Sequence, residues 1–103
     1  MDNIEEVRGK LWTVVTRNRD KALEVISAIE TNYDVPVVKR KINSQYINLF
    51  FDDGVWLRWV KPTDSARGYR HGKLWCDKSI PLDDLRLHIL TKYFGKYEDI
   101  VWF

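Results

Sequence analysis

The chain has 103 residues, a formal net charge of +2 and 45% hydrophobic residues, five of them tryptophans. This size and apolar content indicate one domain, residues 1–103, with a hydrophobic core, and they exclude a disordered chain. The net charge is too small to indicate a nucleic-acid-binding protein by itself.

The only cysteine, Cys76, excludes a disulfide within the chain and is typical of a protein that is in a reducing compartment or is indifferent to redox conditions. No apolar run approaches the roughly 20 residues that a membrane helix needs. The first six residues are acidic after the methionine and lack the basic start of a secretory signal. We therefore expect a cytoplasmic protein with no membrane partner.

Residues 10–16 are rich in β-branched and aromatic side chains, which predicts a buried strand. Thr16 or Asn18 can cap the helix that follows. The helix ends before Pro36, because the residue before a proline resists helical geometry. Its apolar stripe is formed by Ala22, Val25, Ile26, Ile29 and Tyr33.

The middle of the chain predicts three strands. Residues 37–42 are apolar and then basic, as in an exposed or edge strand. Residues 45–51 and 55–61 alternate between two faces, with Trp56, Arg58 and Val60 together on one face of the second strand. Asp53-Gly54 between them predicts a two-residue hairpin turn.

The last third predicts a polar loop at 62–72 and a short strand at 74–76. A second helix is expected from Pro81 to a cap at Gly95, followed by a final strand at 98–103. The order is then β-α-β-β-β-β-α-β. This order predicts a single α+β domain in which two helices cover a mixed, mainly antiparallel sheet.

The sequence contains no complete catalytic, cofactor or metal motif. His71, Cys76 and His88 do not have zinc-ligand spacing, and neither histidine adjoins a nucleophile in a catalytic motif. His88 is expected to be a partly exposed helical residue and Cys76 an inert core residue. The acidic pairs at 52–53 and 83–84 fit a turn and a helix start. We expect no catalytic residues, no metal and no cofactor.

The loop before the short strand is the strongest candidate for a binding site. The segment 61–78 has five cationic and two acidic residues, a local charge of +3. Arginine pairs with phosphate or carboxylate in a bidentate manner, tyrosine stacks on a base, and glycine allows close approach of the backbone. The alternatives are a solvated loop whose arginines pair with acids such as Asp64, and a plain surface role for the histidine. The candidate ligand-binding residues are Arg67, Tyr69, Arg70, His71 and Lys73.

Three short motifs occur in order: Phe-Asp-Asp-Gly at 51–54, Ala-Arg-Gly-Tyr-Arg at 66–70 and Leu-Trp-Cys-Asp at 74–77. From Leu11 to Lys78 the chain resembles the middle of the ATPase domain of phage terminase large subunits. In that family a hairpin, an Arg-Gly loop and an apolar strand ending in Asp-Glu follow one another. The resemblance implies a phage or mobile-element origin and places Asp77 where that family holds magnesium.

The chain departs from that family at the residues that carry hydrolysis. It has no Gly-x-x-x-x-Gly-Lys-Ser/Thr loop to cradle phosphates. Lys78 stands where the family has the glutamate that polarises water, and Asp77 alone is a poor magnesium site. The resemblance therefore implies binding without ATP hydrolysis.

Three functions remain open. The first is a small non-catalytic protein that binds nucleic acid or a phosphate-bearing ligand through the basic loop. The second is a protein–protein interaction module, such as a phage-encoded inhibitor of a host or defence protein, with tryptophans as anchors. The third is a small enzyme, for which the sequence offers no catalytic pair.

Overall fold

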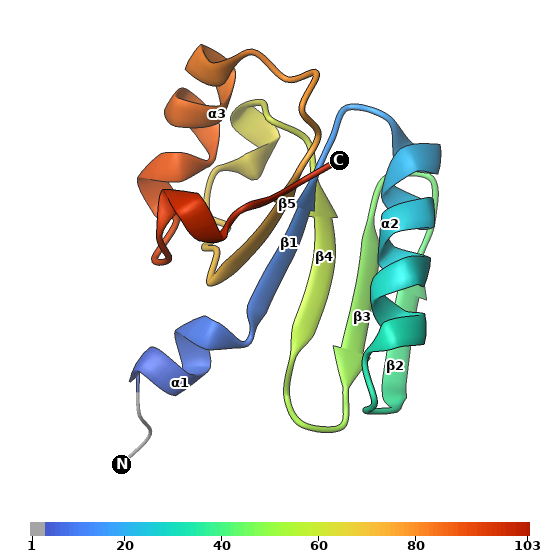
Figure 1. The fold of residues 1–103 in the computed structure, drawn as a ribbon. Coiled ribbons are helices and arrows are strands. Elements are labelled where there is room, and N and C mark those ends of the chain that lie inside the picture. The colour runs from blue at the N-terminus through green and yellow to red at the C-terminus, as the bar shows by residue number, and fades with distance from the viewer. Residues whose placement is uncertain (1–3) are drawn as a thin grey trace.

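A six-stranded sheet organises the computed structural model, which describes residues 4–103 (Figure 1). The order of the strands across the sheet is β2-β3-β4-β1-β5-β6. The strands are β1 (Leu11–Val15), β2 (Val37–Ile42), β3 (Ile47–Phe51), β4 (Trp56–Val60), β5 (Lys73–Cys76) and β6 (Val101–Trp102).

The sheet has an antiparallel half and a parallel half. β2, β3 and β4 pair in antiparallel fashion, whereas β1 pairs in parallel with both β4 and β5, and β5 with β6. The parallel half arises because β1, the first strand in the chain, inserts between β4 and β5. The α+β class and the mixed sheet are confirmed, with antiparallel pairing limited to β2, β3 and β4.

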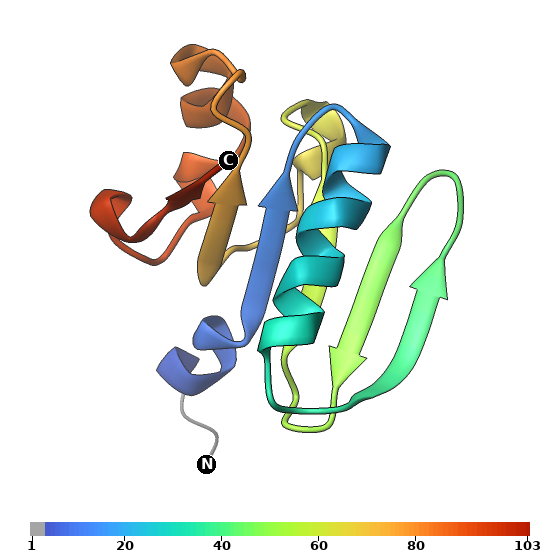
Figure 2. The ribbon, with the colours of Figure 1, turned by 45° about the vertical axis from the view of Figure 1, so that its right-hand side comes forward.

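Helices lie on both faces of the sheet (Figure 2). The alternation along β1 directs Val14 into a core with α2 (Arg19–Asn32) and Val15 into a second core with α3 (Leu82–His88). Ile26 of α2 packs in the first core, and Leu85 of α3 packs in the second. Asn18 begins α2, because its side chain accepts a hydrogen bond from the backbone amide of Lys21.

The predicted hairpin between β3 and β4 is confirmed, but its turn differs from the prediction. Phe51 and Val55 close the loop through a 2.9 Å backbone bond, so that it contains three residues, 52–54. Gly54 has a φ of 91°, whereas no non-glycine residue of the described chain has a positive φ. A two-residue type I′ turn needs a positive φ at both central residues, which Asp53 does not adopt.

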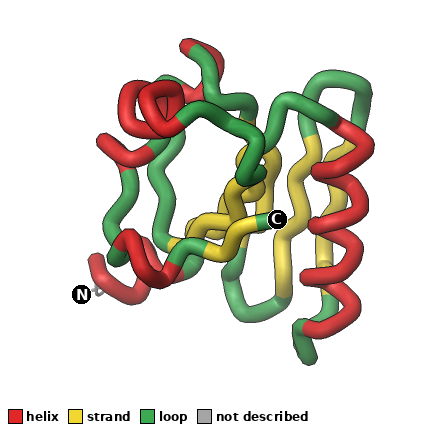
Figure 3. The backbone as a smooth tube through the Cα atoms, turned by 45° about the horizontal axis from the view of Figure 1, so that its top comes forward, coloured by secondary structure: helices red, strands yellow, loops and turns green. Residues whose placement is uncertain are grey.

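Two helical predictions were incomplete. α1 (Ile4–Gly9) was not predicted from the sequence. The second predicted helix does not reach Gly95: α3 ends at His88, and separate 3-10 turns follow at Leu90–Lys92 and Tyr97–Asp99 (Figure 3). The predicted helix is interrupted because residues 92–94 pair with His71 through the backbone. The amide of His71 donates to the Lys92 carbonyl, and the His71 carbonyl accepts from the Phe94 amide. The predicted strand at 98–103 is correspondingly reduced to β6.

None of the helices in the described part of the chain combines the length and the apolar character that a membrane span requires. The longest of them, α2, has 14 residues.

Candidate functional site

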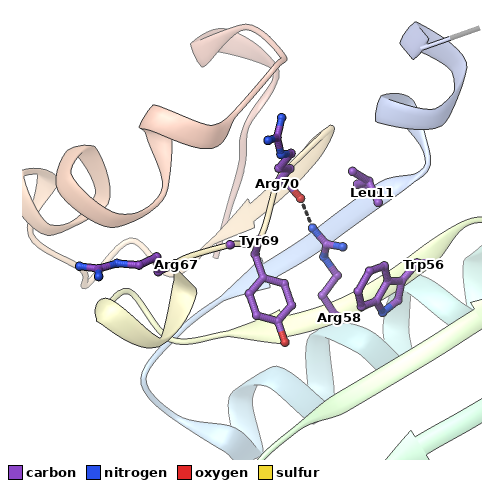
Figure 4. Close-up of a pocket in the computed structure, with 7 residues that line it drawn as sticks. Leu11, Trp56, Arg58, Arg67, Tyr69 and Arg70 are labelled. Carbon is purple, nitrogen blue, oxygen red and sulfur yellow. Dashed lines mark hydrogen bonds between the residues drawn. The ribbon is translucent and has the colours of Figure 1, made fainter.

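A cleft of about 410 Å³ opens where the loop between β4 and β5 crosses the sheet face opposite α2 (Figure 4). Strand β4 supplies its floor, and the loop, which includes the 3-10 turn Asp64–Ala66, supplies its wall. The residues that line the cleft are Leu11, Trp56, Arg58, Arg67, Gly68, Tyr69 and Arg70.

Arg58 forms the floor of the cleft and is only 1% exposed. Its Nε donates to the Thr13 hydroxyl at 2.9 Å, and its Nη2 donates to the Arg70 carbonyl. The guanidinium carbon lies 4.5 Å from the ring centroid of Trp56 and 5.4 Å from that of Tyr69. Figure 4 shows the guanidinium between these two rings. Contacts with neighbouring elements thus fix the orientation of this cation.

The charge of Arg58 has no carboxylate partner among the described residues. Burial lowers the pKa of its guanidinium to about 10, which leaves it charged at neutral pH. A buried charge is costly unless an opposite charge or several hydrogen bonds compensate it. In this site two acceptors and two ring faces compensate part of the cost, and Nη1 makes no hydrogen bond with the described part of the chain.

His71 is fully buried and is not among the residues that line the cleft, so the alternative of a plain surface role for this histidine is wrong. Its Nδ1 is 2.7 Å from the Thr13 hydroxyl, which also accepts from Arg58. Its Nε2 is buried without a hydrogen-bond partner in the described chain. Burial, and then the neighbouring Arg58 charge, lower the pKa of His71 to about 3. His71 is therefore neutral, and its Nδ1 fixes the orientation of the Thr13 hydroxyl.

Three of the candidate ligand-binding residues, Arg67, Tyr69 and Arg70, line the cleft. Tyr69 turns its ring toward Arg58, while the side chains of Arg67 and Arg70 extend outward and are exposed (Figure 4). Neither arginine forms an ion pair within residues 4–103. The alternative pairing with Asp64 was wrong, because that carboxylate lies 3.7 Å from His88 instead.

Lys73 belongs to the other face of the sheet. Its ammonium lies 4.9 Å from the ring centroid of Trp12 and 5.2 Å from that of Trp75, two rings on the α2 side. Sequence reasoning therefore grouped Lys73 with the cleft only because the two are close in the chain. It also overlooked Arg58, although a single arginine in an otherwise apolar strand was a usable signal.

The carboxylate of Asp77, which directly follows β5, accepts hydrogen bonds from three other residues of the protein. Its Oδ2 accepts from Thr16 at 2.9 Å and from Lys21 at 3.4 Å, and its Oδ1 accepts from the amide and hydroxyl of Ser79. Burial opposes the ionisation of Asp77, but these hydrogen bonds together lower its pKa to about 2. The carboxylate thus joins the loops that follow β1 and β5.

The other candidates for chemistry have structural positions. Cys76 is fully buried, and burial raises the pKa of its thiol to about 12, as expected for an inert core residue. His88 is partly exposed, as predicted. Over the described chain, no three His, Cys, Asp or Glu side chains lie close enough together to hold a metal ion.

Comparisons with known proteins do not extend this description: no family model, no curated protein and no solved structure matches the chain.

Proposed function

We propose that the protein is a non-catalytic binding protein whose cleft takes a phosphate-bearing ligand, with nucleic acid as the main class. The observation that carries this proposal is Arg58, a buried cation with no carboxylate partner, on the floor of an open cleft. A phosphate oxygen would supply the missing anion, since guanidinium groups pair well with phosphate.

The surroundings of Arg58 fit such a ligand. Thr13 and the Arg70 carbonyl hold two donors of the guanidinium and leave Nη1 for a ligand. Trp56 and Tyr69 hold Arg58 between them and are both partly exposed, so they provide apolar surface beside the cation for a base or a sugar. Arg67 and Arg70 add two exposed positive charges at the rim, where they attract an anion from solution.

The proposal includes binding without turnover. The Asp77 carboxylate is occupied by Thr16, Lys21 and Ser79, and the exposed Lys78 follows it. A terminase-like hydrolysis site would need a free magnesium ligand and a carboxylate to orient water at these positions. We therefore expect no magnesium-dependent release of phosphate from ATP by the purified protein. The variant Asp77→Ala should release phosphate at the same background rate as the wild type.

Binding is tested by calorimetric titration of the protein with pyrophosphate and with a mononucleotide, each at two salt concentrations. The double substitution Arg67→Ala/Arg70→Ala should weaken binding by roughly 1–3 kcal/mol per strong contact. It should leave the unfolding midpoint nearly unchanged, because exposed arginines contribute little to folding. Lys78→Ala/Arg86→Ala, which removes two exposed cations that do not line the cleft, is the matched control.

Equal affinity of the wild type and the cleft variant for both probes would contradict the proposal. So would loss of folding in the cleft variant, since that result would give the two arginines a structural role.

A protein–protein interaction module is the second candidate, and one observation favours it. An apolar groove of about 450 Å³ runs beside α2 on the other face of the sheet, with Trp12, Trp75 and Phe103 in its lining. A partner held by these aromatic rings would bind with little dependence on salt, whereas phosphate binding weakens steeply as salt rises. Salt dependence of the affinity therefore separates the two candidates.

A further inference from the structure

The cleft continues onto a sheet face that no helix covers. α2 packs against Ile47 and Leu49 of β3 and Leu57 of β4, so the alternate residues of these strands face the opposite side. The second core, beneath α3, contains no residue of β2 or β3. The uncovered face therefore spans β2, β3 and the start of β4, where the partly exposed Trp56 lies beside the buried Arg58 of the cleft.

The uncovered face has aromatic rings beside the cleft and cations beyond them. Phe50 and Trp56 are stacked, with centroids 5.6 Å apart and planes at 17°, and both are partly exposed. The Trp56 indole donates to the Asn48 side chain at 2.8 Å, which fixes its orientation. In the register of β2 with β3, Lys39 is opposite Phe50 and Lys41 is opposite Asn48.

The charge on this face has one sign. Strands β2, β3 and β4 contain no Asp or Glu at all, and Lys39 and Lys41 are exposed. The neighbouring cation of β2, Arg40, lies on the other face and pairs with Glu30 of α2. Two lysines without a carboxylate in the described chain thus extend the positive field of Arg58, Arg67 and Arg70 across the sheet.

We infer that the ligand of the cleft is single-stranded nucleic acid, which runs from Arg58 across Trp56 and Phe50 to Lys39 and Lys41. The inference rests on the proposed function, because it starts from a phosphate at Arg58. Aromatic faces stack on unpaired bases, and a flanking line of cations follows the phosphates. With strands about 4.8 Å apart, the two spacings from β4 to β2 cover about 10 Å, so the path accommodates roughly two to three nucleotides of an extended single strand.

Two features set the kind of nucleic acid. Bases within a duplex are stacked on one another and cannot reach the Trp56 and Phe50 rings, so a duplex would contact the lysines only. The path presents rings and cations, and the one amide among them, Asn48, already accepts from Trp56. We therefore expect similar affinity for DNA and RNA single strands, because stacking on rings and pairing of cations with phosphates do not depend on the sugar.

The test uses fluorescence anisotropy with labelled oligothymidylates of one to eight nucleotides, oligouridylates of the same lengths and a DNA duplex. The affinity should rise with length up to about three nucleotides and then level off, and the duplex should bind at least tenfold more weakly. Lys39→Ala and Lys41→Ala should each weaken binding of the octamer and reduce its salt dependence by about 0.7 in log–log slope. Phe50→Leu, which keeps apolar volume but removes the ring, should weaken it by about tenfold.

Arg40→Ala is the matched control, since it removes a cation from the same strand on the opposite face. It should leave octamer binding unchanged. Pyrophosphate binding in the cleft should be the same for the wild type and for both lysine variants.

If pyrophosphate binds but the affinity does not grow beyond one nucleotide, or if Arg40→Ala acts like Lys39→Ala, the inference fails while the proposed function stands. A duplex that binds as well as the single strand, or a tenfold preference for one sugar, also overturns it. If neither pyrophosphate nor any oligonucleotide binds, both the inference and the proposed function fail.

Discussion

At the scale of single residues, the Thr13 hydroxyl connects two other buried polar side chains of the site, Arg58 and His71. It accepts from Arg58 Nε at 2.9 Å and contacts His71 Nδ1 at 2.7 Å, and all three side chains are buried. One small residue of β1 thereby joins β4 to the segment before β5. The hydroxyl holds the Arg58 cation in place before a ligand arrives, which lowers the entropic cost of binding.

Thr13→Val should destabilise the protein by about 2–4 kcal/mol, because it leaves two buried polar groups without a partner while keeping the shape of the side chain. Thr13→Ser keeps the hydroxyl and should cost only about 1 kcal/mol for the lost methyl group. Urea unfolding measures both values. Equal losses for the two variants would show that the hydroxyl does not matter.

At the scale of elements, the hairpin of β3 and β4 supports both the cleft and the uncovered face. Its turn depends on Gly54, which has a φ of 91° and whose amide donates to Phe51 at 3.0 Å. The Val55 amide also donates to the Asp53 side chain at 3.1 Å, and this hydrogen bond within the loop stabilises the turn. The position of Trp56 and Arg58 follows directly from this turn, because β4 begins two residues after Gly54.

Gly54→Val should lower the free energy of unfolding by about 1–3 kcal/mol, because a β-branched residue is strained at positive φ. Gly54→Asn should cost less, since asparagine tolerates this region better. Denaturant unfolding of the two variants tests the turn. A valine variant as stable as the wild type would contradict the conformation of the loop.

Local patterns predicted the elements better than they predicted the site. Alternation placed β3 and β4, and the apolar stripe placed α2, since both depend on neighbours in sequence. Contacts between distant segments were not predictable: the bridge between His71 and Tyr93 that shortens the second helix is one example. The pairing of Thr13 with Arg58 across β1 and β4 is another, and it made Arg58 the centre of the cleft.

At the scale of the whole molecule, two buried groups couple folding to acid. His71 has a folded pKa of about 3 against an ordinary value of 6.5. Between these two values the unfolded chain binds a proton that the folded protein does not. Asp77 has a folded pKa of about 2 against an ordinary 3.8, so its stabilising contribution is present above the ordinary value and is lost as the pH falls toward 2. Both groups therefore destabilise the fold as the solution becomes more acidic, His71 first.

The free energy of unfolding should fall from about pH 6.5 downward, with His71 contributing a slope of up to about 1.4 kcal/mol per pH unit. His71→Gln should flatten the profile between pH 6 and pH 4, whatever its effect on stability at neutral pH, because glutamine does not titrate. Asp77→Asn should leave that part of the slope and remove only the contribution of Asp77 to the loss below pH 4, where His71 still contributes down to about pH 3. His88→Gln, which removes the other, partly exposed histidine, serves as the control for the loss of a histidine elsewhere in the fold. Urea unfolding at several pH values measures all four slopes. If His71→Gln keeps the wild-type slope between pH 6 and pH 4, His71 is not held neutral in the folded protein, and the buried support beneath Arg58 has been assigned wrongly.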